Sequence, residues 1–223
     1  DNIKLPLTSI PDTALDLLEK MKAIAGQGYI KTLKSGDTGV GYTIETLLGI
    51  VANSSRKPDY KGIEIKSYRA GQGRSNKFDL FSCVPNWGLS NLKSSKDIVF
   101  KRGQYNEERS RWQLYHTIEA VKPNSYNLML EVDNDYLHQG YVENGKFEMD
   151  VTWEMATLLS RLSTKHSQTF WVAASTRGKG KSEEFQYRSV NYTVEPDLLK
   201  VQVMIEAGEI TVDYLIYEKK KRG

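Results

Sequence analysis

Apolar positions along this chain follow the helical period in some stretches and form short strand-like runs in others. Between Pro11 and Ala25 the leucines and the methionine recur at helical spacing, and Gly26 follows as a stop signal. The pattern predicts further helices over about 153–163 and 197–207, and strands over about 79–84, 126–132, 140–143, 170–174 and 210–217. Strands that alternate with helices predict an α/β (α+β) fold with a mixed central sheet flanked by helices.

A glycine-rich turn over residues 36–41 precedes one more short predicted helix. The glycines of this turn are in the wrong register for a dinucleotide-binding fingerprint, so we expect close backbone approach to a ligand or to the next hairpin. The apolar stripe of the helix is expected to be buried and consists of Ile44, Leu47, Leu48 and Val51. Glu45 lies at the edge of this stripe, where it can face a neighbouring strand.

The candidate chemistry follows this helix. Asp59 comes after a proline, and four residues later Glu64-Ile65-Lys66 forms an acid-x-base pattern on a predicted strand. Strand side chains alternate between faces, so Glu64 and Lys66 share one face while Ile65 points into a core. Gly62 permits a tight turn that brings Asp59 beside Glu64, and paired carboxylates suit Mg²⁺. Lys66 would then orient a nucleophile and offset negative charge, although the same residues also fit an ordinary solvated strand.

A second motif, at residues 175–182, ends in Gly-Lys-Ser after a hydrophobic strand and invites a phosphate-binding-loop interpretation. Ser175 replaces the first glycine which that loop requires, and residues 183–187 do not begin an amphipathic helix. We therefore predict a flexible basic loop over DNA. The three histidines show no metal-ligand spacing and are expected to have surface or core roles: His116, His138 and His166.

Composition adds that the chain is long enough for one sizeable core, with 223 residues of which 39% are hydrophobic. The net charge is only +3, so any affinity for DNA must come from clustered basic residues with interleaved aromatic ones. The polar stretch 89–115 lacks a clear period and is predicted to be a DNA-facing excursion rather than core. The chain has a single cysteine, Cys83, so an intrachain disulfide is excluded and a reducing cytoplasm is expected. No apolar run has the length of about 20 residues that a membrane-spanning helix needs.

Three elements in this order resemble the MvaI/BcnI family of restriction endonucleases, with MutH, the mismatch-repair nicking enzyme, as a more distant relative. They are the Gly-x-Gly-x-Thr-x-Glu segment at 39–45, the Pro-Asp at 58–59 and the Ile-Glu-Ile-Lys-Ser strand at 63–67. The resemblance covers roughly residues 30–217. It implies a PD-(D/E)XK core with a DNA-binding cleft, in one endonuclease domain of two possible lobes. The catalytic core would take about 30–85 and 125–176, and the recognition elements about 86–124 and 177–223.

The resemblance implies that Asp59, Glu64 and Lys66 form the catalytic set and that Glu45 assists metal binding. It places Asp59, Glu64, Ile65 and Glu45 at a Mg²⁺ site. The expected enzyme is a cytoplasmic monomer that cuts double-stranded DNA sequence-specifically and leaves 5′-phosphates. Two alternatives stay open: a MutH-like methyl-directed nicking endonuclease, and a catalytically silent DNA-binding domain.

The ends of the chain depart from the family's pattern. Family members continue past this point into a strand with His-Gly and Phe-Arg that helps to read DNA, whereas this chain stops at Gly223. It also begins with Asp1 instead of a methionine. From these two features we expect a fragment or a shorter variant.

Overall fold

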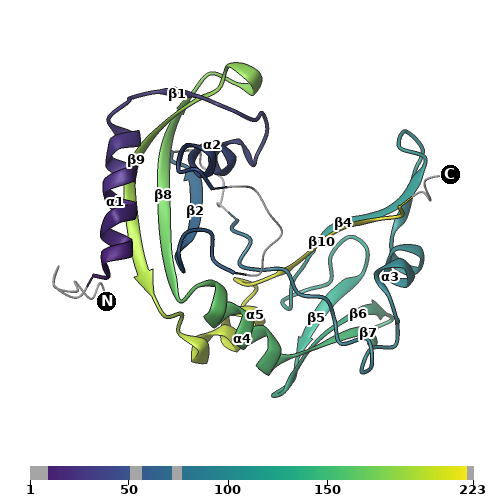
Figure 1. Ribbon diagram of the computed structural model, residues 1–223. Helices are drawn as coiled ribbons and strands as arrows, with labels where there is room; N and C mark the ends of the chain where they lie inside the picture. Colours follow the sequence, from purple (N-terminus) through teal and green to yellow (C-terminus); the bar gives the residue numbers. More distant parts are fainter. Residues whose placement is uncertain (1–9, 51–56, 72–76, 220–223) are drawn as a thin grey trace. The chain divides into compact units, whose positions relative to one another are not determined.

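A computed structural model shows two units (Figure 1). The residues that it describes are 10–50, 57–71 and 77–219. Unit 1 comprises Asp1–Phe81 and Leu162–Pro196, and unit 2 comprises Ser82–Arg161 and Asp197–Gly223. The two lobes expected from the sequence have other boundaries than these units. They place residues 125–161 with the catalytic core and residues 177–196 with the recognition elements.

Unit 1 is built on a four-stranded mixed sheet in the order β1-β9-β8-β2. Its strands are β1 (Ile30–Lys31), β2 (Glu64–Arg69), β8 (Gln168–Arg177) and β9 (Glu184–Val194). β2 runs parallel to β8 with Glu64 beside Thr169, while β8 and β9 pair antiparallel. β2 is therefore an edge strand of this sheet, and one side of its backbone is available to side chains.

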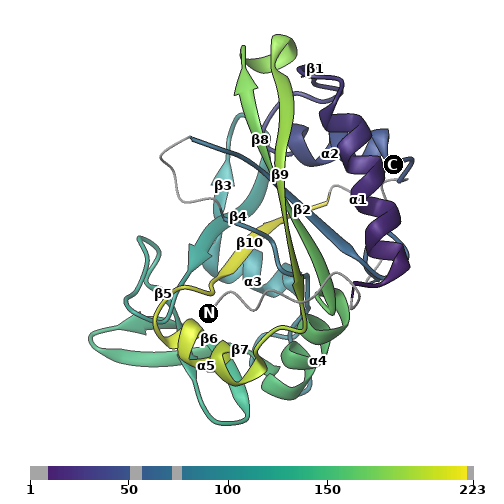
Figure 2. The ribbon, with the colours of Figure 1, turned by 90° about the vertical axis from the view of Figure 1, so that its left-hand side faces the viewer.

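Two helices bury their apolar stripes in the core of unit 1. They are α1 (Asp12–Ala25), which lies along β9 in both ribbon views, and α2 (Gly39–Leu47), which packs on β2 (Figures 1 and 2). Leu17 and Ile44 are fully buried there together with Ile65 of β2. Because Ile65 points into this core, its neighbours Glu64 and Lys66 lie on the opposite face of the strand. A third helix, α4 (Met155–Lys165), runs from unit 2 into unit 1.

Unit 2 contains two three-stranded antiparallel sheets, in the orders β10-β4-β3 and β5-β6-β7. Their strands are β3 (Gln104–Asn106), β4 (Arg111–Ile118), β5 (Leu128–Val132), β6 (Tyr136–Glu143), β7 (Lys146–Glu154) and β10 (Val212–Tyr217). The helices of this unit are α3 (Ser95–Arg102) and α5 (Val201–Glu206). A short 3₁₀ turn occurs at Leu198–Lys200 in this unit, and another occurs at Gly180–Ser182 in unit 1.

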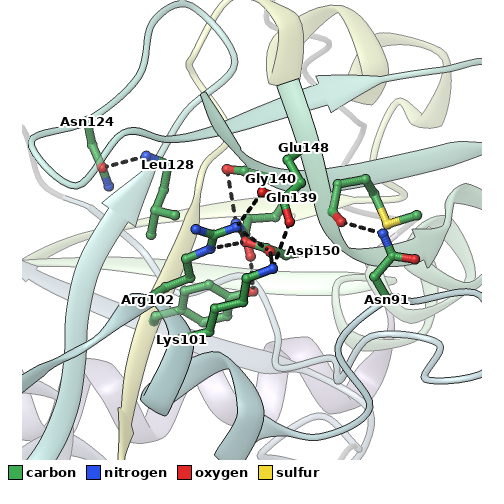
Figure 3. Close-up of polar contacts among 11 residues, drawn as sticks. Asn91, Lys101, Arg102, Asn124, Leu128, Gln139, Gly140, Glu148 and Asp150 are labelled. Atoms are coloured by element: carbon green, nitrogen blue, oxygen red, sulfur yellow. Dashed lines mark hydrogen bonds and ion pairs between the residues drawn. The ribbon is translucent and has the colours of Figure 1, made fainter. Parts of the chain in front are cut away.

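A buried polar network links α3, β6, β7 and β10 in unit 2 (Figure 3). Asp150, which is 0% exposed, accepts hydrogen bonds from Nε and Nη2 of Arg102 at 2.8 and 2.9 Å. Gln139 donates to Asp150 at 3.1 Å and accepts from the Tyr214 hydroxyl at 3.0 Å. A buried carboxylate needs such partners, so we interpret this network as structural.

The predicted α/β class with a mixed sheet and flanking helices is confirmed. The predicted helix at 11–25 corresponds to α1, and the short helix that carries Glu45 corresponds to α2. Of its expected apolar stripe, Ile44 is buried, whereas Leu47 is 37% exposed and Val51 lies outside the described residues. Among the described residues, no helix has the length and apolar character that crossing a membrane requires.

The predicted strand at 79–84 is wrong, because this segment has no strand partner in the described structure. Side chains bind its backbone instead. The Leu80 carbonyl lies 2.8 Å from Nε2 of His166, and the Cys83 carbonyl accepts from the indole N–H of Trp153 at 3.0 Å. The apolar residues of the segment are therefore held by side-chain hydrogen bonds and not by a sheet ladder.

Two predicted loops contain regular structure. The polar stretch 89–115 includes α3 and the start of β4, and its Ile98, Val99 and Leu114 are buried, so the expectation of a non-core excursion is wrong in part. The basic loop beyond residue 175 is shorter than expected. β8 continues to Arg177 and β9 begins at Glu184.

Candidate active site

The side chain of Asp59 is hydrogen-bonded to the backbone of β2 at the unpaired edge of the strand. A tight turn closed by paired backbone hydrogen bonds between Tyr60 and Ile63 precedes the strand, and Gly62 adopts a φ of 93° there. The turn lets Oδ2 of Asp59 accept a hydrogen bond of 3.0 Å from the backbone N–H of Ile65. The N–H and C=O of one strand residue point to the same side. The carbonyl of Ile65 therefore faces the edge that Asp59 occupies.

Glu64 is a buried carboxylate between two lysines. Its Oε1 lies 2.9 Å from Nζ of Lys66, and its Oε2 lies 2.7 Å from Nζ of Lys165, the last residue of α4. Lys165 also lies 3.6 Å from Oδ1 of Asp59. Lys165 therefore pairs with both carboxylates, and its shorter contact is with Oε2 of Glu64.

The carboxylates influence one another electrostatically. Burial raises the pKa of Glu64, and the ammonium groups of Lys66 and Lys165 oppose this effect. Burial also raises the pKa of Glu45 on α2, and the negative charges of Asp59 and Glu64 raise it further. Three carboxylates from α2, the turn and β2 therefore belong to one electrostatic cluster.

Replacing Glu45 by glutamine is expected to raise the melting temperature of the metal-free protein at pH 7 by about 2 °C. The pKa of Glu45 is raised on folding, so its contribution to stability is full below the ordinary carboxylate pKa and is lost as the pH rises through the folded-state pKa. At pH 4 the melting temperature of the variant should equal that of the parent. Thermal unfolding in EDTA at both pH values tests this, and an equal gain at both would contradict it. Glu19→Gln, at an exposed glutamate of α1, is the control.

The donor set fits a hard divalent cation. Among the described residues, no group of three or more His, Cys, Asp or Glu side chains is arranged to hold a metal ion, and lysines pair with the carboxylates of Glu64 and Asp59. All the donors, however, are oxygens, which Mg²⁺ prefers. Oε2 of Glu64 is buried and lies 2.7 Å from Nζ of Lys165, so a cation would compete with that ammonium group for this oxygen. The oxygen donors are the feature that fits such an ion.

The structure brings together the four side chains predicted from the sequence and adds Lys165, which the sequence analysis missed. Lys165 ends α4, two residues past the predicted helix at about 153–163, and no local pattern marks it. His166, next to it, has partners for both ring nitrogens, namely the Leu80 carbonyl and the Thr169 hydroxyl. Burial lowers the pKa of His166, which is consistent with the predicted core role. The catalytic roles of the predicted residues stay predictions.

Comparison with known proteins identifies the class. The structure titled "Restriction endonuclease MvaI-cognate DNA substrate complex" matches with a TM-score of 0.80 and 21% identity, over 92% of this chain and 84% of that one. The structure of MvaI in the absence of DNA matches with a TM-score of 0.50 and 21% identity, over 92% and 83% of the two chains. The fold is thus that of a restriction endonuclease. A search of curated proteins found no match.

The sequence itself identifies the family. Residues 18–223 match the model of the MvaI/BcnI restriction endonuclease family, and the chain belongs to that family. It is accordingly a type II site-specific deoxyribonuclease, an endonuclease that cuts DNA at a defined sequence.

Proposed function

We propose that this enzyme hydrolyses the phosphodiester bonds of double-stranded DNA with Mg²⁺ as cofactor and leaves 5′-phosphate and 3′-hydroxyl ends. The observation that carries the proposal is the position of Glu64. This carboxylate is 1% exposed, contacts two lysines and lies on the edge strand to which Asp59 is bonded. A fold that needed only stability would gain little from burying this group, because burial disfavours its ionised form.

The residues that would hold the ion are Asp59, Glu64, the carbonyl of Ile65 and, at the margin of the cluster, Glu45. When bound, Mg²⁺ stabilises negative charge that develops on the phosphate. Asp59 is oriented for this role by the backbone N–H of Ile65. The carboxylates must be ionised to bind a cation, so the raised pKa of Glu45 and Glu64 makes protons compete for the site at a higher pH than usual.

The two lysines have different proposed roles. Lys66 shares a strand face with Glu64, so its ammonium group would orient the attacking water and stabilise the transition-state charge. Lys165 is a positioning residue: it binds the carbonyl of Lys57 at 3.0 Å and lies near both Asp59 and Glu64. It would keep these carboxylates together before a cation arrives.

A monomeric, cytoplasmic enzyme is part of the proposal. All the side chains of the cluster come from one chain, so no second copy is needed to complete the site. A chain with a single cysteine also needs no oxidising compartment.

Digestion of unmethylated supercoiled plasmid with Mg²⁺ tests the proposal. We expect discrete linear fragments whose ends carry 5′-phosphates at one recurring short sequence, and no products in EDTA. The Asp59→Asn variant should bind DNA but not cut it, since an amide holds a cation far more weakly than a carboxylate.

The alternatives predict other products from the same assay. Accumulation of nicked circles alone, with cutting of hemimethylated sites, would favour the nicking enzyme. Intact plasmid under every condition, together with a gel shift of the DNA, would favour the silent binding domain. Either outcome would contradict the proposed double-strand cleavage.

A further inference from the structure

Helix α2 packs on β2 with Gly41 facing the strand, so no side chain of this residue fills the space between the two elements (Figure 1). A methyl group built on Gly41 would lie 3.4 Å from Oγ of Ser67 and 3.5 Å from Oε1 of Glu45. Glu45 comes four residues after Gly41 and therefore lies on the same side of the helix. The side chains of Ser67 and Glu45 thus border one small gap beside the active site.

Ser67 brings a buried hydrogen-bond donor to this gap. It follows Lys66 on β2, and its Oγ is closed off from solvent and has no hydrogen-bond partner in the described structure. A serine hydroxyl donates one hydrogen bond, and buried polar groups are nearly always paired. The partner of this hydroxyl must come from within the protein, because a molecule in solution cannot reach it.

Glu45 is the carboxylate of the cluster that no donor holds. Asp59 accepts a hydrogen bond of 3.0 Å from the N–H of Ile65, and Glu64 pairs with two lysines. Neighbouring charges act on Glu45 through space, but none of the described residues donates a hydrogen bond to its carboxylate. A glutamate side chain has several rotatable bonds, so a carboxylate that nothing holds loses conformational entropy when a cation fixes it.

The backbone of α2, in contrast, is firmly held. The buried hydroxyl of Tyr187 on β9 donates to the carbonyl of Val40 at 2.9 Å. The guanidinium of Arg69 on β2 donates to the carbonyls of Gly36 and Asp37, in the turn before the helix, at 2.9 Å each. The fold thus fixes the helix, and only the carboxylate end of its glutamate needs a further contact.

We propose that the hydroxyl of Ser67 donates a hydrogen bond to the carboxylate of Glu45 and is a positioning residue for the cation site. The inference rests on the proposed function, because it takes Glu45 as a residue of that site. A buried donor without an acceptor and a carboxylate without a donor border the same gap. Rotation about the terminal bonds of Glu45, which costs little, brings them together. One carboxylate oxygen then accepts from Ser67 while the other faces the cation, and such hydrogen bonds orient metal-binding groups.

Titration with Mn²⁺ in the absence of DNA, followed by the electron paramagnetic resonance signal of the free ion, tests the inference without requiring cleavage. Ser67→Ala removes the donor, and Gly41→Ala places a methyl group between the two side chains. Each should weaken Mn²⁺ binding by about 10-fold. On a Glu45→Ala background neither substitution should weaken it further, because the hydrogen bond acts only through that carboxylate. Ser189→Ala, at an exposed serine of β9, is the control.

Stability separates this role from a packing role. Ser67→Ala removes a hydroxyl that has no partner in the described structure, so no hydrogen bond is lost. Gly41→Ala puts a better helix former into α2, and its methyl group makes contacts of ordinary van der Waals length. In EDTA both variants should therefore melt at the parent's temperature or above it, although they bind Mn²⁺ more weakly.

The outcomes distinguish the inference from the proposed function. Parental Mn²⁺ affinity in Ser67→Ala, or an equal loss of affinity from Ser67→Ala on the Glu45→Ala background, would overturn the inference and leave the proposed function intact. Parental affinity in Glu45→Ala itself would also overturn it. A parent protein that neither binds Mn²⁺ nor cuts plasmid would contradict the proposed function, and with it the inference.

Discussion

Replacing Glu64 by glutamine is expected to remove DNA cleavage at every Mg²⁺ concentration, a loss of more than about 10³-fold. The substitution keeps the shape of the side chain but removes the negative charge from between Lys66 and Lys165, which lie 2.9 and 2.7 Å from its oxygens. The two ammonium groups would then repel each other and any arriving cation. Initial rates on a duplex with a single site, measured up to high Mg²⁺, check this result.

The same variant should be no less stable than the parent at pH 7. Burial raises the pKa of Glu64 in spite of its two lysine partners, so the folded protein favours the uncharged side chain. Denaturant unfolding measures this stability, with Glu19→Gln as the control for a glutamate in an exposed pair. Cleavage within tenfold of the parent's rate, by a folded variant, would refute the role given to Glu64.

Replacing Lys66 by methionine is expected to lower the cleavage rate by about 10³-fold while the protein still binds divalent cation. Methionine keeps most of the length of the side chain but lacks the charge that stabilises the transition state. Cation affinity should not fall, because a positive neighbour of Glu64 has been removed. Single-turnover cleavage separates the chemical step from binding, and cation titration by calorimetry measures affinity.

Lys165→Met is the matched comparison, since it removes the other lysine on the same carboxylate. A positioning role predicts a smaller rate loss than for Lys66→Met and tighter cation binding, because Lys165 competes for Glu64 and Asp59. Lys61→Met, at an exposed lysine of the preceding turn, should change neither quantity. Equal rate losses for Lys66→Met and Lys165→Met would contradict the different roles proposed for them.

Local patterns predicted those parts of the fold that local physics controls. The helix period at 11–25 and the alternation around Ile65 correspond to α1 and β2. The segment 79–84, which was wrongly predicted to be a strand, is as apolar as a buried strand. Its backbone carbonyls, however, accept hydrogen bonds from side chains of distant segments. Apolar and polar residues alternate along β7 and β9, but these two strands were not predicted from the sequence.

For the candidate site, the sequence by itself determined the family, through short motifs that specify a tight turn at Gly62 and the shared face of Glu64 and Lys66. These features are local because turn conformation and strand alternation depend on neighbouring residues. Only the tertiary structure decided that Lys165 joins the carboxylates of Asp59 and Glu64. This contact depends on which distant strands and helices meet, and chain segments that pair across long separations leave no mark in the adjacent sequence.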